Sequence, residues 1–97
     1  MNSIIKGNEK GKCFICGKRC NTECHHIFFG AGNRRISEKY GLKIDLCHFC
    51  HNEPPYGVHF NKSLDKKLKA DIQLEAMLYY GWSTAEFISK FGKNYIY

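Results

Sequence analysis

Apolar residues in the last third of the chain recur with the period of an α-helix. Leu64, Leu68, Ile72, Ala76 and Tyr79 follow one another at spacings of four, four, four and three, and Met77 and Leu78 widen the stripe. This spacing puts them on one face, so it predicts an amphipathic helix whose stripe packs against the rest of the protein. Asn61 or Ser63 can cap its start, and Gly81 can end it. We expect its lysines to form a solvated face: Lys62, Lys66, Lys67 and Lys69.

A second, shorter helix is predicted after the first. Ser83 and Glu86 have the spacing of a capping box, and Gly92 can end the helix. Its apolar face consists of Phe87, Ile88 and Phe91. We interpret both helices as packing elements, because stripes of Leu, Met and aromatic residues at this period usually belong to a core.

The first 52 residues lack such a period. Six glycines punctuate them and indicate turns rather than long helices: Gly7, Gly11, Gly17, Gly30, Gly32 and Gly41. In the loop that follows, Pro54, Pro55 and Gly57 stop any helix that enters it. We expect a single domain over residues 1–97. It would comprise an N-terminal segment over 1–12, a Cys- and His-rich core over 13–60 and a helical pair over 61–97.

The 97-residue chain is basic, with fifteen Lys and Arg against nine Asp and Glu and a formal charge of +6. Residues 1–50 hold nine of the basic and four of the acidic residues. This imbalance fits a nucleic-acid partner and a merely soluble cationic surface equally well. No apolar run approaches the roughly 18 residues of a membrane span, and the first residues lack the apolar core of a signal peptide. We therefore expect a cytoplasmic protein without a membrane partner, whose six cysteines stay reduced and available to a metal.

Four of the six cysteines form two C-x-x-C pairs. Cys13 and Cys16 make the first, with Gly17 directly after it, and Cys47 and Cys50 make the second. A two-residue spacer lets both sulfurs of one turn reach the same Zn²⁺, which prefers four ligands in a tetrahedron. The glycine allows the positive φ that such a turn needs. We predict a structural Zn²⁺ bound by these four cysteines.

Cys20 and Cys24 lie outside both pairs. One expectation is that each is a small buried apolar residue, which is the common fate of a free cysteine. Alternatively, one of them replaces a ligand of the zinc site, or the two form a disulfide. The sequence leaves these alternatives open.

All five histidines lie between residues 25 and 59, and the helical tail has none. They are His25, His26, His48, His51 and His59. A lone histidine is usually a satisfied core residue, but an adjacent pair and a third directly after a C-x-x-C pair indicate a site. Imidazole suits both transition-metal binding and proton transfer near neutral pH.

Residues 24–27 (Cys-His-His-Ile) and 46–51 (Leu-Cys-His-Phe-Cys-His) resemble the HNH nucleases, whose small fold is called ββα-metal. The resemblance implies an α+β fold, a small zinc-stabilised ββα-metal domain that here carries a C-terminal helical extension. It implies a β-hairpin with His25 as ligand of a catalytic metal and His26 as general base. It also implies that His51 opens the next helix and binds the same ion. Because adjacent strand residues point to opposite faces, His25 and His26 can share one site only where the strand twists or ends.

The chain departs from the pattern of that family in the middle of the motif. Leu42 stands where the motif has an asparagine, and Asn33 is the nearest substitute. Asn33 either orients His26 as part of the catalytic site or merely turns its loop.

A second departure concerns a later metal ligand. Pro55 stands at its expected position, so His59 is the best substitute and Asn61 a weaker one. The prolines also predict that the helix after His51 is short or distorted.

Arg34 and Arg35 follow a loop with two glycines within residues 30–32. Bare backbone beside guanidinium groups suits phosphate contacts, and the alternative is a flexible, solvated turn. Just before this loop, Phe28 and Phe29 either stack on nucleic-acid bases or pack in the core, and we expect core packing for at least one.

Together these expectations describe metal-dependent hydrolysis of DNA that leaves 5′-phosphate and 3′-hydroxyl ends, as the family does. One divalent ion, Mg²⁺, Mn²⁺, Ni²⁺ or Zn²⁺, would lie at His25, His51 and His59, and Arg34 or Arg35 would hold a phosphate. A homodimer or a protein partner would supply specificity. The alternative is a non-catalytic zinc module that binds nucleic acid or protein, for example a phage-encoded inhibitor of a host enzyme. The resemblance also points to a phage or prophage origin.

Overall fold

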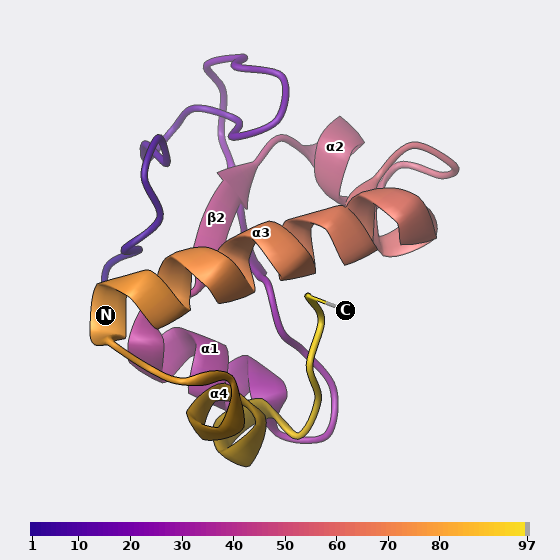
Figure 1. The fold of residues 1–97 in the computed structure, drawn as a ribbon. Coiled ribbons are helices and arrows are strands. Elements are labelled where there is room, and N and C mark those ends of the chain that lie inside the picture. The colour runs from indigo at the N-terminus through magenta and orange to yellow at the C-terminus, as the bar shows by residue number, and fades with distance from the viewer. Residues whose placement is uncertain (97) are drawn as a thin grey trace.

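Two short antiparallel strands, the helix between them and a layer of helices make up an α+β fold. A computed structural model describes residues 1–96. Its elements are β1 (Glu23–His26), α1 (Asn33–Tyr40), β2 (Lys43–Leu46), α2 (His48–Asn52), the 3-10 turn η1 (Val58–Phe60), α3 (Lys62–Tyr80) and α4 (Thr84–Phe91). Figure 1 shows α3 crossing the molecule, with β2 and α2 above it and α1 and α4 below it in this view.

The sheet consists of β1 and β2 in a register that pairs His25 with Ile44 and His26 with Lys43. Ile44 and Leu46 are fully buried, and His25 is buried beside them. Alternation along the strands therefore sends one face of the sheet into the core, and His25 is on that face.

The connection between the strands contains a helix that the sequence analysis did not predict. We expected a hairpin with a glycine-rich turn at residues 30–35, but α1 begins at Asn33 and fills the connection. Gly32 and Gly41 flank this helix with φ of 86° and 71°, so the glycines bracket a regular helix rather than prevent one. Gly41 also permits a close approach, because a Cβ there would lie 2.5 Å from the Asn2 carbonyl oxygen.

The helix predicted from the apolar period is confirmed by α3. The side chain of Asn61 caps it by accepting a hydrogen bond from the N–H of Leu64, and Gly81 ends it. Of the predicted stripe, Leu68, Ile72 and Ala76 are buried.

The C-terminal part of that stripe was predicted wrongly. Leu78 is 78% exposed and Tyr79 is 60% exposed, whereas Gln73 is fully buried. The Gln73 side chain donates to Asn94 Oδ1 at 2.8 Å and accepts from the Tyr95 N–H at 2.7 Å. A satisfied polar residue thus occupies the core side of α3 because it fixes the C-terminal segment there.

The lysines of α3 do not all lie on a solvated face. The Lys67 side chain is 72% exposed, as expected. That of Lys69 is only 14% exposed and pairs with Asp65 at 2.8 Å. Its aliphatic stem is covered, and its ammonium group lies 4.2 Å from the centre of the Phe29 ring.

The second predicted helix is confirmed by α4, which starts with the capping box of Ser83 and Glu86 and ends at Gly92. Its Phe87 and Phe91 rings are buried, whereas Ile88 is 38% exposed.

The buried rings of α4 enclose Phe28, which is fully buried. The centre of the Phe28 ring lies 5.2 Å from that of Phe87, 4.7 Å from Phe91 and 5.1 Å from Tyr95. This aromatic cluster anchors the chain directly after β1. Among the helices of residues 1–96, none combines the length and the apolar character that a membrane crossing requires.

Candidate functional site

The cysteines of the two C-x-x-C pairs converge. The Sγ atoms of Cys13, Cys16, Cys47 and Cys50 all lie within 4.8 Å of one another. Cys16 Sγ and Cys47 Sγ are 3.8 Å apart. A tetrahedron with Zn–S bonds near 2.3 Å has edges of about 3.8 Å. The cluster is therefore positioned to bind a structural metal such as zinc, and we call it the cysteine cluster.

Both knuckles of this cluster have the same local geometry. The N–H of Cys16 donates to Cys13 Sγ and the N–H of Cys50 to Cys47 Sγ, each at 3.5 Å. Gly17 has a φ of 78°, as predicted for the turn. Burial acts to raise the pKa of Cys13, but backbone N–H groups lower it to about 6, which favours a thiolate. Burial and the adjacent thiols raise the pKa of Cys50, so ionising all four sulfurs requires a cation to offset their charge.

Cys20 and Cys24 are not members of the cysteine cluster. Cys20 is half-buried, whereas Cys24 is exposed, so the expectation of a buried apolar residue fails for Cys24. Both are free thiols in residues 1–96, which contradicts the alternative of a disulfide between them.

Three histidines from three elements form a second group, which we call the histidine cluster. It contains His25 from β1, His51 from α2 and His59 from η1, the same three residues that the sequence analysis proposed as ligands. Their ring centres are 4.7 to 5.1 Å apart. One nitrogen of each lies within 4.8 Å of the others, and His51 Nε2 and His59 Nε2 are 3.0 Å apart. Three imidazoles in this arrangement could hold one transition-metal ion and leave positions for other ligands.

A tight loop brings His59 to His51. We expected His51 to open a short or distorted helix. The helix α2 is short, with five residues, but His51 is its fourth residue, so the predicted position of the helix was wrong. The chain then folds back so closely that a Cβ on Gly57 would lie 2.7 to 2.9 Å from backbone atoms of residues 51–53. Glycine at position 57 thus allows η1 to pack against α2.

The Nε2 atom of His25 is buried and has no hydrogen-bond partner among the described residues. Leaving a buried polar atom unsatisfied costs about 1–3 kcal/mol, and a bound cation at this nitrogen would remove that cost. Burial, followed by the proximity of His51 and His59, lowers the pKa of His25 to about 3. Burial also lowers the pKa of His59. The neutral imidazole is the form that binds a metal through its lone pair.

Glu23, at the start of β1, contacts three residues of α2, among them His51 of the histidine cluster. Its Oε1 atom lies 2.8 Å from His51 Nδ1 and accepts a hydrogen bond from Asn52 at 2.9 Å. Its Oε2 atom lies 3.0 Å from Nδ1 of the exposed His48. Hydrogen bonds from His51 and His48 lower the pKa of Glu23 to about 2, so the carboxylate is ionised at neutral pH. By accepting the Nδ1 proton of His51, it leaves the Nε2 lone pair directed into the cluster.

His26 stands beside the histidine cluster and is not one of its members. Because β1 ends at His26, the two adjacent histidines line one cavity of about 200 Å³, together with His51 and His59. Glu38 Oε1, from α1, lies 2.7 Å from His26 Nε2. Contacts with Lys43, then with His26 and the N-terminal amine, hold the pKa of Glu38 well below its usual range. An ionised Glu38 accepts the Nε2 proton and leaves His26 Nδ1 as a proton acceptor.

Arg34 joins this constellation from the first turn of α1. Its Nε atom donates to His26 Nδ1 at a long 3.4 Å, and its side chain lines the same cavity. Arg35 lines a neighbouring surface cavity of about 440 Å³ together with Arg34, His26 and Glu38. Both arginines thus lie next to His26.

Asn33 does not make the contact with His26 that the sequence analysis considered. Its amide donates to the carbonyl oxygen of Phe91 at 3.2 Å, which ties the start of α1 to the end of α4. The hydrogen bond to His26 comes from Glu38 instead. Asn61, the weaker ligand candidate, caps α3.

Glu23 and Glu38 are the site residues that sequence reasoning missed. Glu23 precedes His25 by two positions, and strand alternation puts both on one face, so this residue could have been found. Glu38 lies on the unpredicted α1, and its sequence position gives no reason to place it beside His26. Comparison with protein-family models, curated proteins and solved structures finds no match to this chain.

Proposed function

We propose that the protein is a metal-dependent nuclease of the HNH type that hydrolyses DNA phosphodiester bonds. The observation that carries the proposal is the pairing of the histidine cluster with a fourth, non-coordinating histidine in one cavity. Hydrolysis of a phosphodiester needs a cation near the phosphate and a separate group that accepts the proton of water. A base that also coordinated the ion would have its lone pair occupied, so two distinct sets of imidazoles suit this division of roles.

The histidine cluster would hold one divalent ion through His25, His51 and His59. When bound, this ion supplies charge that stabilises the phosphate and the departing 3′ oxygen. The unsatisfied His25 Nε2 and the fixed His51 ring fit such an ion. The cysteine cluster would hold the structural Zn²⁺ apart from this chemistry.

His26 acts as the general base in this proposal. Glu38 keeps the proton on Nε2, so Nδ1 can accept a proton from the attacking water. The hydrogen bond from Arg34 to His26 Nδ1 is long. The guanidinium group can therefore move away and donate to a phosphate oxygen instead when DNA binds. The same movement would free Nδ1 for the water. Arg35 adds a second cation on the same side of His26.

The proposal is tested by nicking of supercoiled plasmid with zinc-loaded protein and added Mg²⁺, Mn²⁺ or Ni²⁺, with EDTA as the negative control. His26→Ala is expected to reduce the rate at least 100-fold while its zinc content stays that of the wild type. Leu78→Ala is the control, because Leu78 is 78% exposed and lies outside the histidine cluster and its cavity. It is expected to nick at the wild-type rate.

Two results would contradict the nuclease proposal. DNA binding by the wild type without cleavage under any of the three ions would favour a zinc-stabilised nucleic-acid-binding module. Absence of both cleavage and binding would favour a module that binds protein.

A further inference from the structure

We propose that a lysine-lined cavity beside the histidine cluster binds a phosphate group of the DNA strand that is cut. This inference rests on the proposed function for the position of the scissile phosphate. It adds a second contact point for the strand, formed by α3 and the C-terminal segment.

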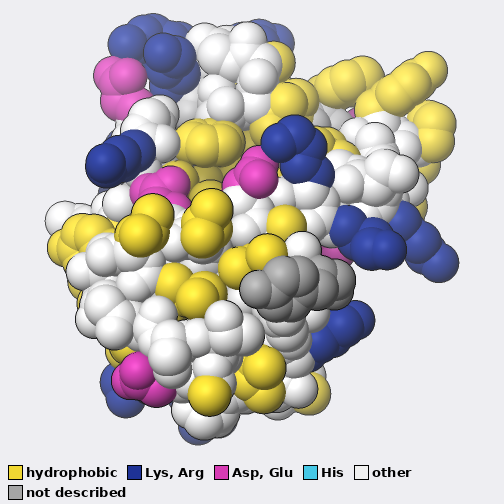
Figure 2. All heavy atoms as spheres, viewed as in Figure 1, with side chains coloured by type: hydrophobic (Ala, Val, Ile, Leu, Met, Phe, Trp, Pro, Cys, Tyr) yellow, Lys and Arg dark blue, Asp and Glu magenta, His cyan; other side chains and the backbone are white. Residues whose placement is uncertain are grey.

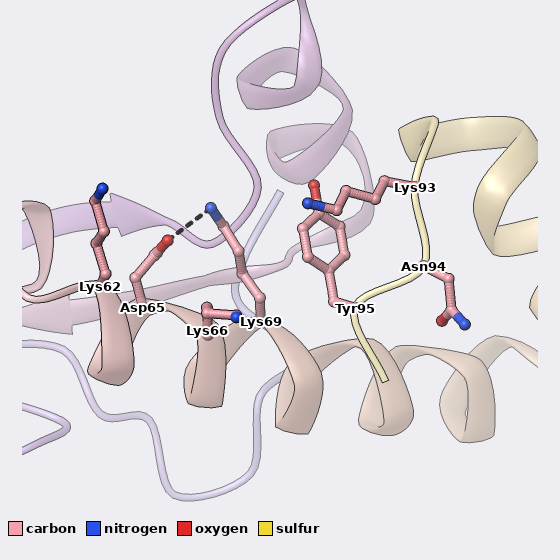
Figure 3. Close-up of a pocket in the computed structure, with 7 residues that line it drawn as sticks. All are labelled: Lys62, Asp65, Lys66, Lys69, Lys93, Asn94 and Tyr95. Carbon is pink, nitrogen blue, oxygen red and sulfur yellow. Dashed lines mark hydrogen bonds and ion pairs between the residues drawn. The ribbon is translucent and has the colours of Figure 1, made fainter. Parts of the chain in front are cut away.

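The cavity has a volume of about 430 Å³ and lies between the first turns of α3 and the segment after α4 (Figure 3). Lys62, Lys66 and Lys69 line it from α3, and Lys93 and Tyr95 line it from the other side. The α3 lysines follow at spacings of four and three, which puts their side chains on one face of the helix. Four lysines thus line one hollow, although like charges at such spacings destabilise a helix.

Little negative charge opposes these lysines. Asp65 is the acidic residue that lines the cavity, and its carboxylate is engaged by Lys69 at 2.8 Å. Within residues 1–96, Lys62, Lys66 and Lys93 form no ion pair, and all three are exposed. Lys and Arg side chains gather over this first part of α3 in the space-filling view (Figure 2). An anionic ligand would offset this excess of positive charge.

One aromatic ring separates the cavity from the histidine cluster. The Lys69 ammonium lies 4.2 Å from the centre of the Phe29 ring, and that ring centre lies 5.2 Å from the His59 ring centre and 5.9 Å from that of His25. Phe29 is 38% exposed, unlike its fully buried neighbour Phe28. A base can therefore stack on Phe29 while one flanking phosphate lies at the histidines and another reaches the lysines.

This order of cation, aromatic ring and metal site matches the repeat of a nucleic-acid strand. Along such a strand, one base projects from the backbone between each pair of neighbouring phosphates. The cavity lysines are flexible point charges rather than a rigid fork, so they suit phosphate oxygens that approach in variable geometry. A polynucleotide also gains affinity from counterion release at every phosphate it places on a lysine.

The test is binding of a fluorescently labelled single-stranded oligonucleotide over a series of KCl concentrations, in a His26→Ala background that prevents cleavage. The cavity variant combines Lys62→Gln, Lys66→Gln and Lys93→Gln and leaves the Lys69–Asp65 pair intact. The control variant combines Lys6→Gln, Lys39→Gln and Lys67→Gln, three exposed lysines that do not line the cavity. Both variants lose the same formal charge, so their difference isolates the position of the charge.

Each phosphate contact of a single strand contributes roughly 0.7 to the magnitude of the slope of log K against log salt. We therefore expect the loss of three lysines in the cavity variant to reduce this magnitude by about 2. At 0.1 M KCl this corresponds to an affinity loss of about 100-fold when the salt-independent part of binding is unchanged. The control variant is expected to retain nearly the wild-type slope. Circular dichroism and zinc content verify that both variants are folded.

The outcomes separate this inference from the nuclease proposal. Equal slopes for the two variants would overturn the cavity as a binding site, whatever the plasmid assay shows. A reduced slope only in the cavity variant supports the cavity, even if the wild type never nicks DNA and the nuclease proposal falls. Calorimetric titration with inorganic phosphate distinguishes a site for small free anions from a site for a DNA phosphate. If the cavity variant loses phosphate binding but keeps the salt slope for DNA, the inference is overturned.

Discussion

Removal of the Glu23 carboxylate is expected to weaken metal binding at the histidine cluster while the cysteine cluster keeps its metal. Glu23 Oε1 lies 2.8 Å from His51 Nδ1, and the same oxygen accepts from Asn52. Without this acceptor, the His51 ring loses both its fixed orientation and the partner that keeps the proton on Nδ1. The Nε2 lone pair is then presented to a metal for only part of the time.

Outer partners of metal-bound histidines typically contribute 10- to 100-fold in affinity, or about 1.4–2.7 kcal/mol. Glu23→Gln retains an acceptor but loses the charge, and charge-assisted hydrogen bonds are roughly twice as strong as neutral ones. We therefore expect about a 10-fold loss of Ni²⁺ affinity for Glu23→Gln and a loss closer to 100-fold for Glu23→Ala.

Isothermal titration of Ni²⁺ into zinc-loaded protein measures this affinity, and elemental analysis shows that one zinc per chain is retained. Glu53→Gln is the matched control, because the Glu53 carboxylate lies near the exposed His48, with Oε2 3.6 Å from its Nε2, and forms no ion pair with the histidine cluster within residues 1–96. It is expected to bind Ni²⁺ like the wild type. Equal Ni²⁺ affinities for the wild type and Glu23→Ala would refute the role of Glu23.

Three further predictions concern other contacts of the fold and site. Glu38→Gln is expected to slow plasmid nicking about 100-fold without changing Ni²⁺ affinity, because it disturbs the protonation of His26 rather than the metal ligands; nicking at the wild-type rate would exclude a positioning role. Asn33→Ala is expected to lower the free energy of unfolding in urea by about 1 kcal/mol, since it removes the hydrogen bond to Phe91, and to leave nicking intact. A loss of nicking without a loss of stability would restore Asn33 as a catalytic residue. Phe28→Ala is expected to lower the free energy of unfolding by about 3–5 kcal/mol, calculated from the shift of the urea midpoint at constant m-value. A decrease below about 1 kcal/mol would show that the aromatic cluster is not the core.

The helical half of the fold could be predicted because its signals are local. The apolar period of α3 and the capping box of α4 are properties of neighbouring residues, and both helices begin and end where these signals indicate. The burial of Gln73 could not be predicted in this way. Its partners, Asn94 and Tyr95, lie more than twenty positions along the chain, so a polar residue on the core side is explained only by the tertiary fold.

The helix α1 was missed for a related reason. Its eight residues lie between Gly32 and Gly41, and glycine indicates a turn as readily as it caps a helix. The error carried over to the site, because Glu38 lies on α1 and Asn33 is its first residue. Once the helix is present, Glu38 faces His26, and Asn33 faces α4.

The candidate metal ligands were easier to predict than the residues that orient them. Spacing alone lets both sulfurs within one C-x-x-C pair reach the same ion, since each pair is a local turn, and the fold brings the two pairs together. His25, His51 and His59 were chosen for their side-chain chemistry, and the fold does bring their rings together. Glu23 acts on His51 across 28 positions, which a list of candidate ligands does not reveal.

The two clusters are joined by α2. We expect this connection to make metal binding at the histidines depend on metal binding at the cysteines. The helix has five residues, too few to be stable alone, and it contains Cys50 and His51 as neighbours, one for each cluster. A metal at the cysteines would hold this helix at both its N-cap, Cys47, and at Cys50, whereas a metal at the histidines would hold it at His51. We therefore expect the cysteine side to support the histidine side more than the reverse. Cys13→Ser alters the cysteine cluster from another part of the chain, and Cys13 is not a member of the histidine cluster. It should nevertheless weaken Ni²⁺ binding at the histidines, while His59→Ala should leave the zinc in place. The opposite pattern would mean that α2 is held by the histidine side of the site.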